Sequence, residues 1–158
     1  MEKNGQGMSC MRDNKSVVTT ERKVFFDTNI LVYSADAKNP QKQLIAASLL
    51  EKASIEKTGL ISTQSLQEFY NAATKKLKLT KQAAKDYVEL FSKQFPVKEI
   101  SIPLILNAVD ISIKHNLSFW DSLIISTANE TGCVVVYSED MNNGQIIDGT
   151  KILNPFAN

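Results

Sequence analysis

The stretch "KVFFDTNILV" at residues 23–32 decides how the fold begins. An apolar, β-prone run ends abruptly at Asp27, two polar residues follow, and the chain is then apolar again. A short run rich in aromatic and β-branched residues is typical of a buried strand. Asp27 lies where this strand is predicted to end, so its carboxylate either caps a following helix or takes part in chemistry.

Further short apolar runs occur at residues 59–62, 97–100, 133–137 and 151–153. Helical patterns separate them, and we predict helices at about 41–55, 64–78, 81–94, 103–115 and 119–130. The clearest is 64–78, where Leu66, Phe69, Tyr70 and Ala73 form one apolar stripe of period 3.6. Gly132 is expected to end the last of these helices. Short apolar strands that alternate with helices require a parallel sheet covered on both faces. We therefore predict an α/β protein, a three-layer α/β/α sandwich with a central parallel sheet, Rossmann-like in arrangement.

Length and composition favour one soluble globular domain. The chain has 158 residues, of which 43% are hydrophobic and 22% charged. A chain of this length buries roughly two thirds of its unfolded surface and folds without disulfides or metal staples. Residues 1–21 are polar and without periodicity, so we predict a flexible N-terminal extension there and a single domain over 22–158.

Charge and cysteine content exclude several classes of protein. Eighteen basic residues against 17 acidic ones give a net charge of +1, which lacks the global basic excess of many nucleic-acid-binding proteins. The two cysteines, Cys10 and Cys133, have no zinc or disulfide spacing. No leader or membrane span is expected from the apolar pattern. We expect a cytoplasmic protein with no membrane partner.

Acidic residues occur where parallel strands end or where the following helices begin, which is the edge at which α/β proteins bind ligands. These residues are Asp27, Glu68, Asp121, Glu139 and Asp140. Each also has a purely structural interpretation. Asp27 suits a helix N-cap, whereas Glu68 and Asp121 each lie three residues after a serine, Ser65 and Ser118, a capping-box spacing. Glu139 and Asp140 are equally typical of a solvated turn.

A shared location would give these carboxylates a common purpose. Several carboxylates in one crevice repel one another unless a cation neutralises them. Oxygen ligands without histidine or cysteine select hard ions such as Mg²⁺ or Mn²⁺. Such ions activate water and stabilise the leaving oxygen of a phosphodiester. The pattern therefore indicates hydrolysis of nucleic acid.

Four stretches carry a resemblance to a known family. They are "FFDTNILVYS" at 25–34, "STQSLQEFYNAATKK" at 62–76, "LSFWDSLIISTANETGC" at 117–133 and "VYSEDMNNGQIIDGTKILNPF" at 136–156. In this order and spacing they resemble the PIN-domain nucleases, of the VapC type found as toxins of bacterial toxin–antitoxin pairs. The resemblance extends over about 22–158.

The resemblance implies a PIN-like fold, an acidic pocket for one or two Mg²⁺ or Mn²⁺ ions, and metal-dependent endoribonuclease activity on RNA. It also implies a cognate antitoxin as partner and a homodimer. The acidic residues of the family, which are catalytic and bind metal, fall on Asp27, Glu68, Asp121 and Asp140. Asn29 matches a residue that supports the first aspartate, Ser138 matches a residue that lines the pocket, and the resemblance does not decide whether Glu139 or Asp140 points inward.

RNA contacts would fall to lysines, because the only arginines are Arg12 and Arg22. Lysines cluster at the junction of two predicted helices, either to hold phosphates or as a solvated face. The cluster consists of Lys75, Lys76, Lys78, Lys81 and Lys85. His115 has no nucleophile motif beside it. Trp120 either stacks on a base or packs the start of its helix.

Two alternatives of other classes remain. The first alternative is a PIN-like RNA-binding or scaffold module without catalysis, although such modules typically lose a carboxylate and here all four positions are filled. Otherwise it is a phosphatase with an aspartate nucleophile, although that chemistry requires a second acid where this sequence has Asn29.

Overall fold

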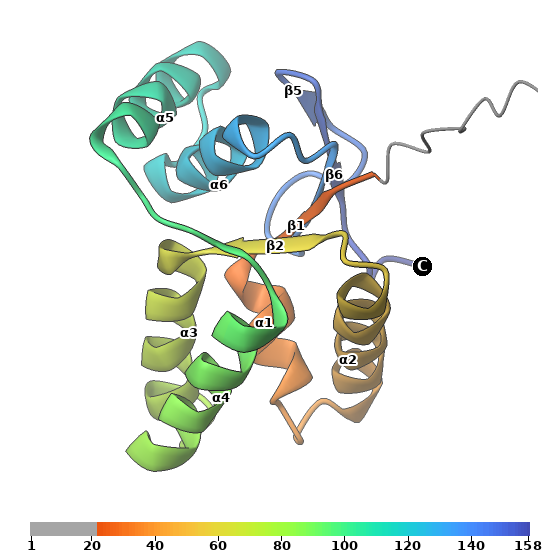
Figure 1. Cartoon of the computed structure of the whole chain (residues 1–158). Coiled ribbons are helices and arrows are strands. Elements are labelled where there is room, and N and C mark those ends of the chain that lie inside the picture. The colour runs from red at the N-terminus through yellow and green to blue at the C-terminus, as the bar shows by residue number, and fades with distance from the viewer. Residues whose placement is uncertain (1–21) are drawn as a thin grey trace, which may run out of the picture.

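The computed structural model of the chain describes residues 22–158, shown in Figure 1. The strands in this part are β1 (Val24–Phe26), β2 (Gly59–Ser62), β3 (Val97–Lys98), β4 (Val135–Tyr137), β5 (Ile146–Ile147) and β6 (Thr150–Leu153). The helices are α1 (Thr28–Ser34), α2 (Pro40–Ile55), α3 (Thr63–Lys75), α4 (Lys81–Gln94), α5 (Ile102–His115) and α6 (Phe119–Glu130). The predicted extension at 1–21, with Cys10 and Arg12, lies outside the described residues.

The strands form one sheet in the order β3-β2-β1-β4-β6-β5. Neighbouring strands are parallel, except that β5 and β6 form an antiparallel hairpin. The chain runs from β1 outward to β3 and then returns to place β4 on the other side of β1. Strand order therefore reverses between β1 and β4, where an α/β sheet opens a crevice for ligands.

Helices cover both faces of the sheet. Figure 1 shows α1 to α4 on one side of the strands and α5 and α6 on the other. Because side chains alternate along a strand, neighbouring phenylalanines of β1 enter different cores. Phe26 packs with Phe69 on the α1–α4 side, and Phe25 packs with Ile125 on the α6 side. The predicted three-layer α/β/α class is confirmed, and the sheet is parallel as predicted except at β5.

The predicted elements agree with most of the observed boundaries. Helices α4 and α6 begin and end where predicted, and Gly132 follows α6 with a φ of 72°. The sequence did not predict α1 or β5, which are 7 and 2 residues long. Both are too short for a periodic pattern to identify them.

The predicted capping box at Ser65 was wrong. Ser62 is the N-cap of α3, and its side chain accepts a hydrogen bond from the backbone N–H of Ser65. Ser65 completes the box in place of a glutamate. Glu68 therefore lies one turn further along the helix and has no capping role.

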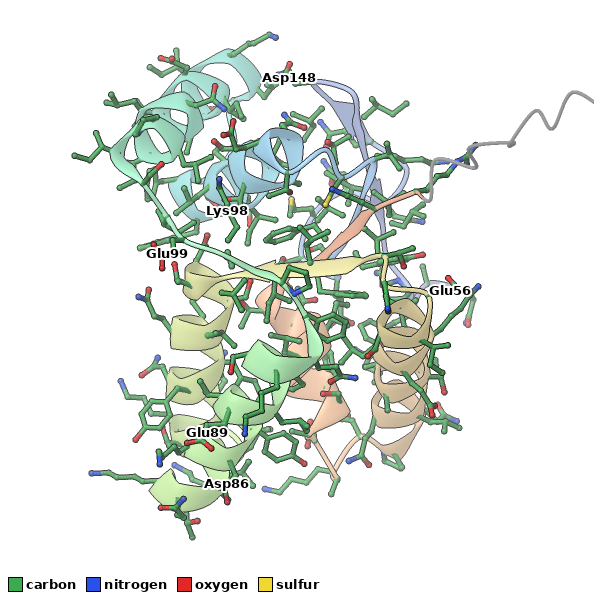
Figure 2. All side chains as sticks on the ribbon, in the orientation of Figure 1. Glu56, Asp86, Glu89, Lys98, Glu99 and Asp148 are labelled. Carbon is green, nitrogen blue, oxygen red and sulfur yellow. The ribbon has the colours of Figure 1, made fainter. Side chains whose placement is uncertain are left out.

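Several charged side chains of the helices are exposed. Figure 2 shows Asp86 and Glu89 on the outer side of α4 and Glu56 at the end of α2, and all three are exposed. Within the part of the chain that the structure describes, no helix has the length and hydropathy needed to cross a membrane.

Candidate active site

Four predicted carboxylates line one cavity of about 570 Å³ at the crevice beside β1 and β4. Asp27 follows β1, Asp140 follows β4, Glu68 lies in α3 and Asp121 in the first turn of α6. The cavity thus receives side chains from both helical layers. Among the described residues 22–158, no lysine or arginine lines it.

Asp27 is held at the floor of the site by hydrogen bonds to both carboxylate oxygens. It is the N-cap of α1, and its Oδ1 accepts from the backbone N–H of Thr28 at 2.7 Å. Its Oδ2 accepts from the Ser138 hydroxyl at 2.7 Å and from the Asn29 amide at 3.3 Å. Only 7% of Asp27 is exposed. The capping role and a place in the cavity are therefore compatible.

Burial raises the pKa of Asp27 from 3.8 to about 7, because removal from water disfavours the charged carboxylate. The hydrogen bonds from Ser138 and Thr28 lower this pKa, and the negative charges of Glu68 and Asp140 raise it further. The hydrogen bonds to Asp27 therefore offset only part of the cost of burying its charge.

Both carboxylate oxygens of Glu68 are also hydrogen bonded. Thr28 donates from its hydroxyl to Oε2 at 3.0 Å, and Gln64 donates from Nε2 to Oε1 at 2.8 Å. Nε2 of Gln64 also lies 3.4 Å from the backbone oxygen of Trp120 in α6. The buried Oε1 of Gln64 has no hydrogen-bond partner among the described residues.

Asn29 links the two ends of the crevice. Its amide nitrogen donates to Asp140 Oδ2 at 3.1 Å as well as to Asp27, and its Oδ1 accepts from the Glu139 backbone N–H at 3.3 Å. The Ser138 hydroxyl accepts from the backbone N–H of Asp140 at 3.2 Å. Asn29 and Ser138 thus lie between the carboxylates, as side chains that support them would.

Glu139 and Asp140 make different contacts, although both line a second cavity that adjoins the first. Glu139 forms an ion pair with Lys42 of α2, which itself donates to the Tyr33 hydroxyl at 3.1 Å. Burial raises the pKa of Glu139, but the hydrogen bonds from Lys42 and Tyr33 outweigh this effect and the net shift is downward. Asp140 instead lines the cavity with Asp27 and Glu68.

A second cavity of about 530 Å³ adjoins the first. The two share Asp27, Glu68, Asn71 and Asp140, so three of the four carboxylates lie where the cavities meet and Asp121 lines the first cavity alone. Lys75 and Lys76 line the second cavity. The rest of the predicted lysine cluster lies elsewhere, since Lys78, Lys81 and Lys85 do not line it and Lys85 pairs with Glu89 at 3.1 Å.

The donor set suits a hard divalent cation. The carboxylates supply only oxygen ligands, and no basic side chain in the first cavity competes with a metal ion for them. In the arrangement described for residues 22–158, no three acidic, histidine or cysteine side chains already converge on one metal position. The chemistry of the residues fits Mg²⁺ or Mn²⁺, and a bound ion would have to draw the carboxylates closer together.

The single histidine of the sequence, His115, lies apart from the carboxylates. The Nε2 atom of His115 lies 3.1 Å from Oδ1 of Asp148, and His115 lines neither cavity.

Sequence reasoning missed several residues that complete the site. Gln64 precedes Glu68 by four positions, a spacing at which helix side chains meet, so this contact was recognisable once the helix was predicted. Asn71 extends the same face by a further turn. Thr28 and Lys42 carried no such signal, because their partners lie 40 and 97 residues away.

The family profile described as PIN domain matches residues 24–143, which include all four carboxylates. The chain belongs to the PIN domain family. A search of curated proteins gives no match.

Solved structures of PIN proteins share the fold. The chain is similar to DNA-bound VapBC from Salmonella typhimurium, with a TM-score of 0.63 and 19% identity over 83% of this chain and 96% of that one. A toxin–antitoxin complex from Klebsiella pneumoniae gives a TM-score of 0.61 and 19% identity over 85% and 98%. The sarcin-ricin loop cleaving toxin VapC20 of Mycobacterium tuberculosis gives 0.59 and 18% over 75% and 90%. At these identities the likeness concerns the fold.

Proposed function

We propose that this PIN domain is a divalent-metal-dependent endoribonuclease and the toxin of a toxin–antitoxin pair. The observation that carries the proposal is that Asp27, Glu68, Asp121 and Asp140 line one cavity to which no lysine or arginine of the described residues contributes. Membership of the PIN family and the fold shared with a sarcin-ricin loop cleaving toxin support it. A scaffold module would have no need of four carboxylates that line one cavity.

The four carboxylates would hold Mg²⁺ or Mn²⁺. A bound divalent cation supplies a water of lowered pKa and charge stabilisation for the leaving oxygen of a phosphodiester. The protein's own contribution is positioning. Ser138 and Thr28 hold Asp27, and Thr28 and Gln64 hold Glu68, so neither carboxylate is free to turn away.

Asn29 has a function in this proposal that excludes aspartyl-phosphatase chemistry at the same position. Its amide donates to both Asp27 and Asp140 and thereby holds two negative groups at a fixed separation. An amide has no acidic proton to give to a leaving group, as that chemistry requires.

The substrate in this proposal is RNA, whose phosphates approach from the second cavity. Lys75 and Lys76 line that cavity, which meets the first one at the carboxylates. Lysines act as point charges for phosphate. They compensate for a site that would otherwise repel a polyanion.

An antitoxin would inhibit the enzyme by covering or filling the acidic cavity. Two of the similar structures are toxin–antitoxin assemblies from Salmonella typhimurium and Klebsiella pneumoniae, which supports such a partner. A basic side chain of the antitoxin would match a cavity that has none of its own.

The direct test is cleavage of RNA by the purified chain and its Asp27→Asn variant. We expect cleavage that requires Mg²⁺ or Mn²⁺, stops on chelation, and falls by at least about 100-fold in the variant, because Asp27 is the most buried ligand. Asp86→Asn, on the outer surface of α4, is the matched control and should retain full activity. Metal-dependent cleavage that is as fast in Asp27→Asn as in the wild-type chain would contradict the proposal.

A further inference from the structure

The first cavity has a wall that the four carboxylates do not explain. Trp120 lines this cavity, although 61% of its surface is exposed. The ring of the neighbouring Phe119 contacts it edge-on, with ring centroids 5.2 Å apart and an interplanar angle of 69°. An indole that only packed the start of α6 would be buried, so this side chain presents an aromatic surface to whatever enters the cavity.

Amide side chains also line this cavity. Gln64, Gln67 and Asn71 line the cavity from one face of α3, because positions 64, 67, 68 and 71 follow the helical period. Gln67 and Asn71 are exposed. Amides offer a donor and an acceptor together, the combination that pairs with the edge of a nucleobase.

The amide and aromatic walls are fixed to the acidic centre. Gln64 donates both to Glu68 and toward the backbone oxygen of Trp120, so one side chain ties α3, the carboxylate and the tryptophan together. The two cavities that meet at the carboxylates therefore differ in chemistry. The second carries Lys75 and Lys76, whereas the first carries no basic residue but an exposed tryptophan and three amides.

We propose that the first cavity is a nucleobase subsite, in which one unstacked base of single-stranded RNA stacks on Trp120 while Gln67 and Asn71 hydrogen bond to its edge. Proteins that recognise single-stranded RNA commonly combine an aromatic platform with hydrogen bonds to the base edge. The inference rests on the proposed ribonuclease function and assigns to this cavity the choice of base beside the cleaved phosphate.

Trp120 is the only tryptophan of the chain, so intrinsic tryptophan fluorescence reports on this subsite alone. The full chain with Asp27→Asn, which prevents cleavage, is titrated with single-base hexaribonucleotides in Mg²⁺. We expect saturable quenching of the fluorescence, to an extent that differs among the four bases. Absence of quenching at concentrations where a labelled hexaribonucleotide is bound would overturn the proposal. Quenching by an antitoxin but not by RNA would overturn it as well.

Variants separate stacking from general binding. In the same background, Trp120→Leu should weaken binding of the labelled RNA by about 5- to 100-fold, the range expected for one lost base–aromatic stack. Trp120→Phe should keep most of the affinity. Tyr70→Leu is the matched control, because Tyr70 is an exposed aromatic residue of α3 that lines neither acidic cavity. Equal affinity of Trp120→Leu and the parent would overturn the proposal.

The amides are tested by base preference. Gln67→Ala combined with Asn71→Ala should reduce the ratio between the best- and worst-bound hexaribonucleotide by at least about fivefold. An unchanged ratio would overturn the assignment of the amide wall. The proposed function is tested separately: a parent chain that cleaves RNA but fails these binding tests disproves the subsite alone, whereas failure to cleave RNA disproves the nuclease.

Discussion

Asp27 combines a structural and a proposed chemical role through its two oxygens. Oδ1 caps α1 by accepting from the Thr28 N–H, whereas Oδ2 faces Ser138, Asn29 and the crevice. A cap ordinarily stabilises a helix by about 1 kcal/mol. The desolvation of this carboxylate opposes that gain, so the residue is costly to the metal-free fold.

Replacing Asp27 should therefore stabilise the metal-free protein at high pH. The pKa of Asp27 is about 7 in the folded chain against 3.8 for an ordinary aspartate, so the folded state binds the proton more tightly. Below pH 4 both states are protonated and no penalty exists; as the pH rises to 7 stability is lost, by at most roughly 4 kcal/mol. In urea unfolding with EDTA, the free energy of unfolding of Asp27→Asn should be higher than that of wild type at pH 8 and equal to it near pH 4.

Asp86→Asn provides the comparison, because this exposed carboxylate of α4 is not desolvated. It should change the free energy of unfolding little at either pH. If Asp27→Asn were less stable than wild type at pH 8, burial would not dominate the electrostatics of the site.

Ser138 should control metal affinity without touching the metal. Its hydroxyl donates to Asp27 Oδ2 at 2.7 Å and accepts from the backbone N–H of Asp140, so Ser138→Ala frees the Asp27 carboxylate and loosens the backbone that carries Asp140. Loss of such a supporting hydrogen bond typically costs 10–100-fold in metal affinity, and we expect about this loss for Mn²⁺ by titration calorimetry. Ser92→Ala, at an exposed position of α4, is the control and should bind Mn²⁺ as wild type does. Unchanged Mn²⁺ affinity of Ser138→Ala would indicate that the four carboxylates are not the metal ligands.

At the scale of elements, α3 serves the core and the site with opposite faces. Phe69 and Ala73 are fully buried against the core, whereas Gln64, Glu68 and Asn71 line the cavity. The apolar stripe thus fixes the rotation of the helix, and that rotation aims Glu68 at the crevice. Because the packing of α3 against the core sets the position of Glu68, the residue at which the helix begins matters for the site as well.

The same logic applies to α6, whose N-cap places Asp121. The Ser118 hydroxyl accepts from the Asp121 N–H at 3.1 Å, so Ser118→Ala should lower the free energy of unfolding by about 1 kcal/mol in urea denaturation. Ser101 is the matched control, since it is the N-cap of α5 without a side-chain capping bond. Ser101→Ala should cost much less, and equal losses would show that capping is not the cause.

At the scale of the molecule, the proposed site depends on both helical layers. Asp27 and Glu68 belong to the α1–α4 side of the sheet, whereas Asp121 comes from α6 on the other side (Figure 1). Only the reversal of strand order between β1 and β4 leaves the crevice through which both sides reach one cavity. Local unfolding of either layer would therefore disable the site.

The outer surface of α5 offers a means of association. Exposed apolar side chains form a stripe along it, and they are Ile102, Ile105, Leu106, Val109 and Ile113. A contiguous apolar stripe on a helix is typical of a protein–protein contact. We expect a homodimer that buries it.

Light scattering coupled to size-exclusion chromatography tests this expectation. Wild type should elute as a dimer and Leu106→Glu as a folded monomer, because a charge in the middle of the stripe would lose its water in the interface. Leu44→Glu, at an exposed leucine of α2, should remain dimeric. A monomeric wild type would show that the chain does not dimerise. A dimeric Leu106→Glu would show that the dimer forms through another surface.

The sequence determined the fold class because the signals are local. Apolar runs of strand length alternating with amphipathic helices leave few arrangements other than a covered parallel sheet, and the turn residues set most boundaries. Asp27, Glu68, Asp121 and Asp140 were recognisable for a related reason: each stands at the end of a strand or in a following segment, on the edge where such sheets bind ligands. The short α1 and β5 lacked enough residues to show a period.

Only the tertiary structure decided the pairing of side chains distant in sequence. Thr28 meets Glu68, Asn29 meets Asp140 and Lys42 meets Glu139 because β1 lies between β2 and β4 and α2 packs beside α1, and no local pattern encodes these contacts. Glu139 pairs with Lys42 and lines only the second cavity, whereas Asp140 lines both cavities, a difference that two adjacent acidic residues in a loop do not reveal. Burial of Asp27, which raises its pKa, is likewise a property of the assembled layers.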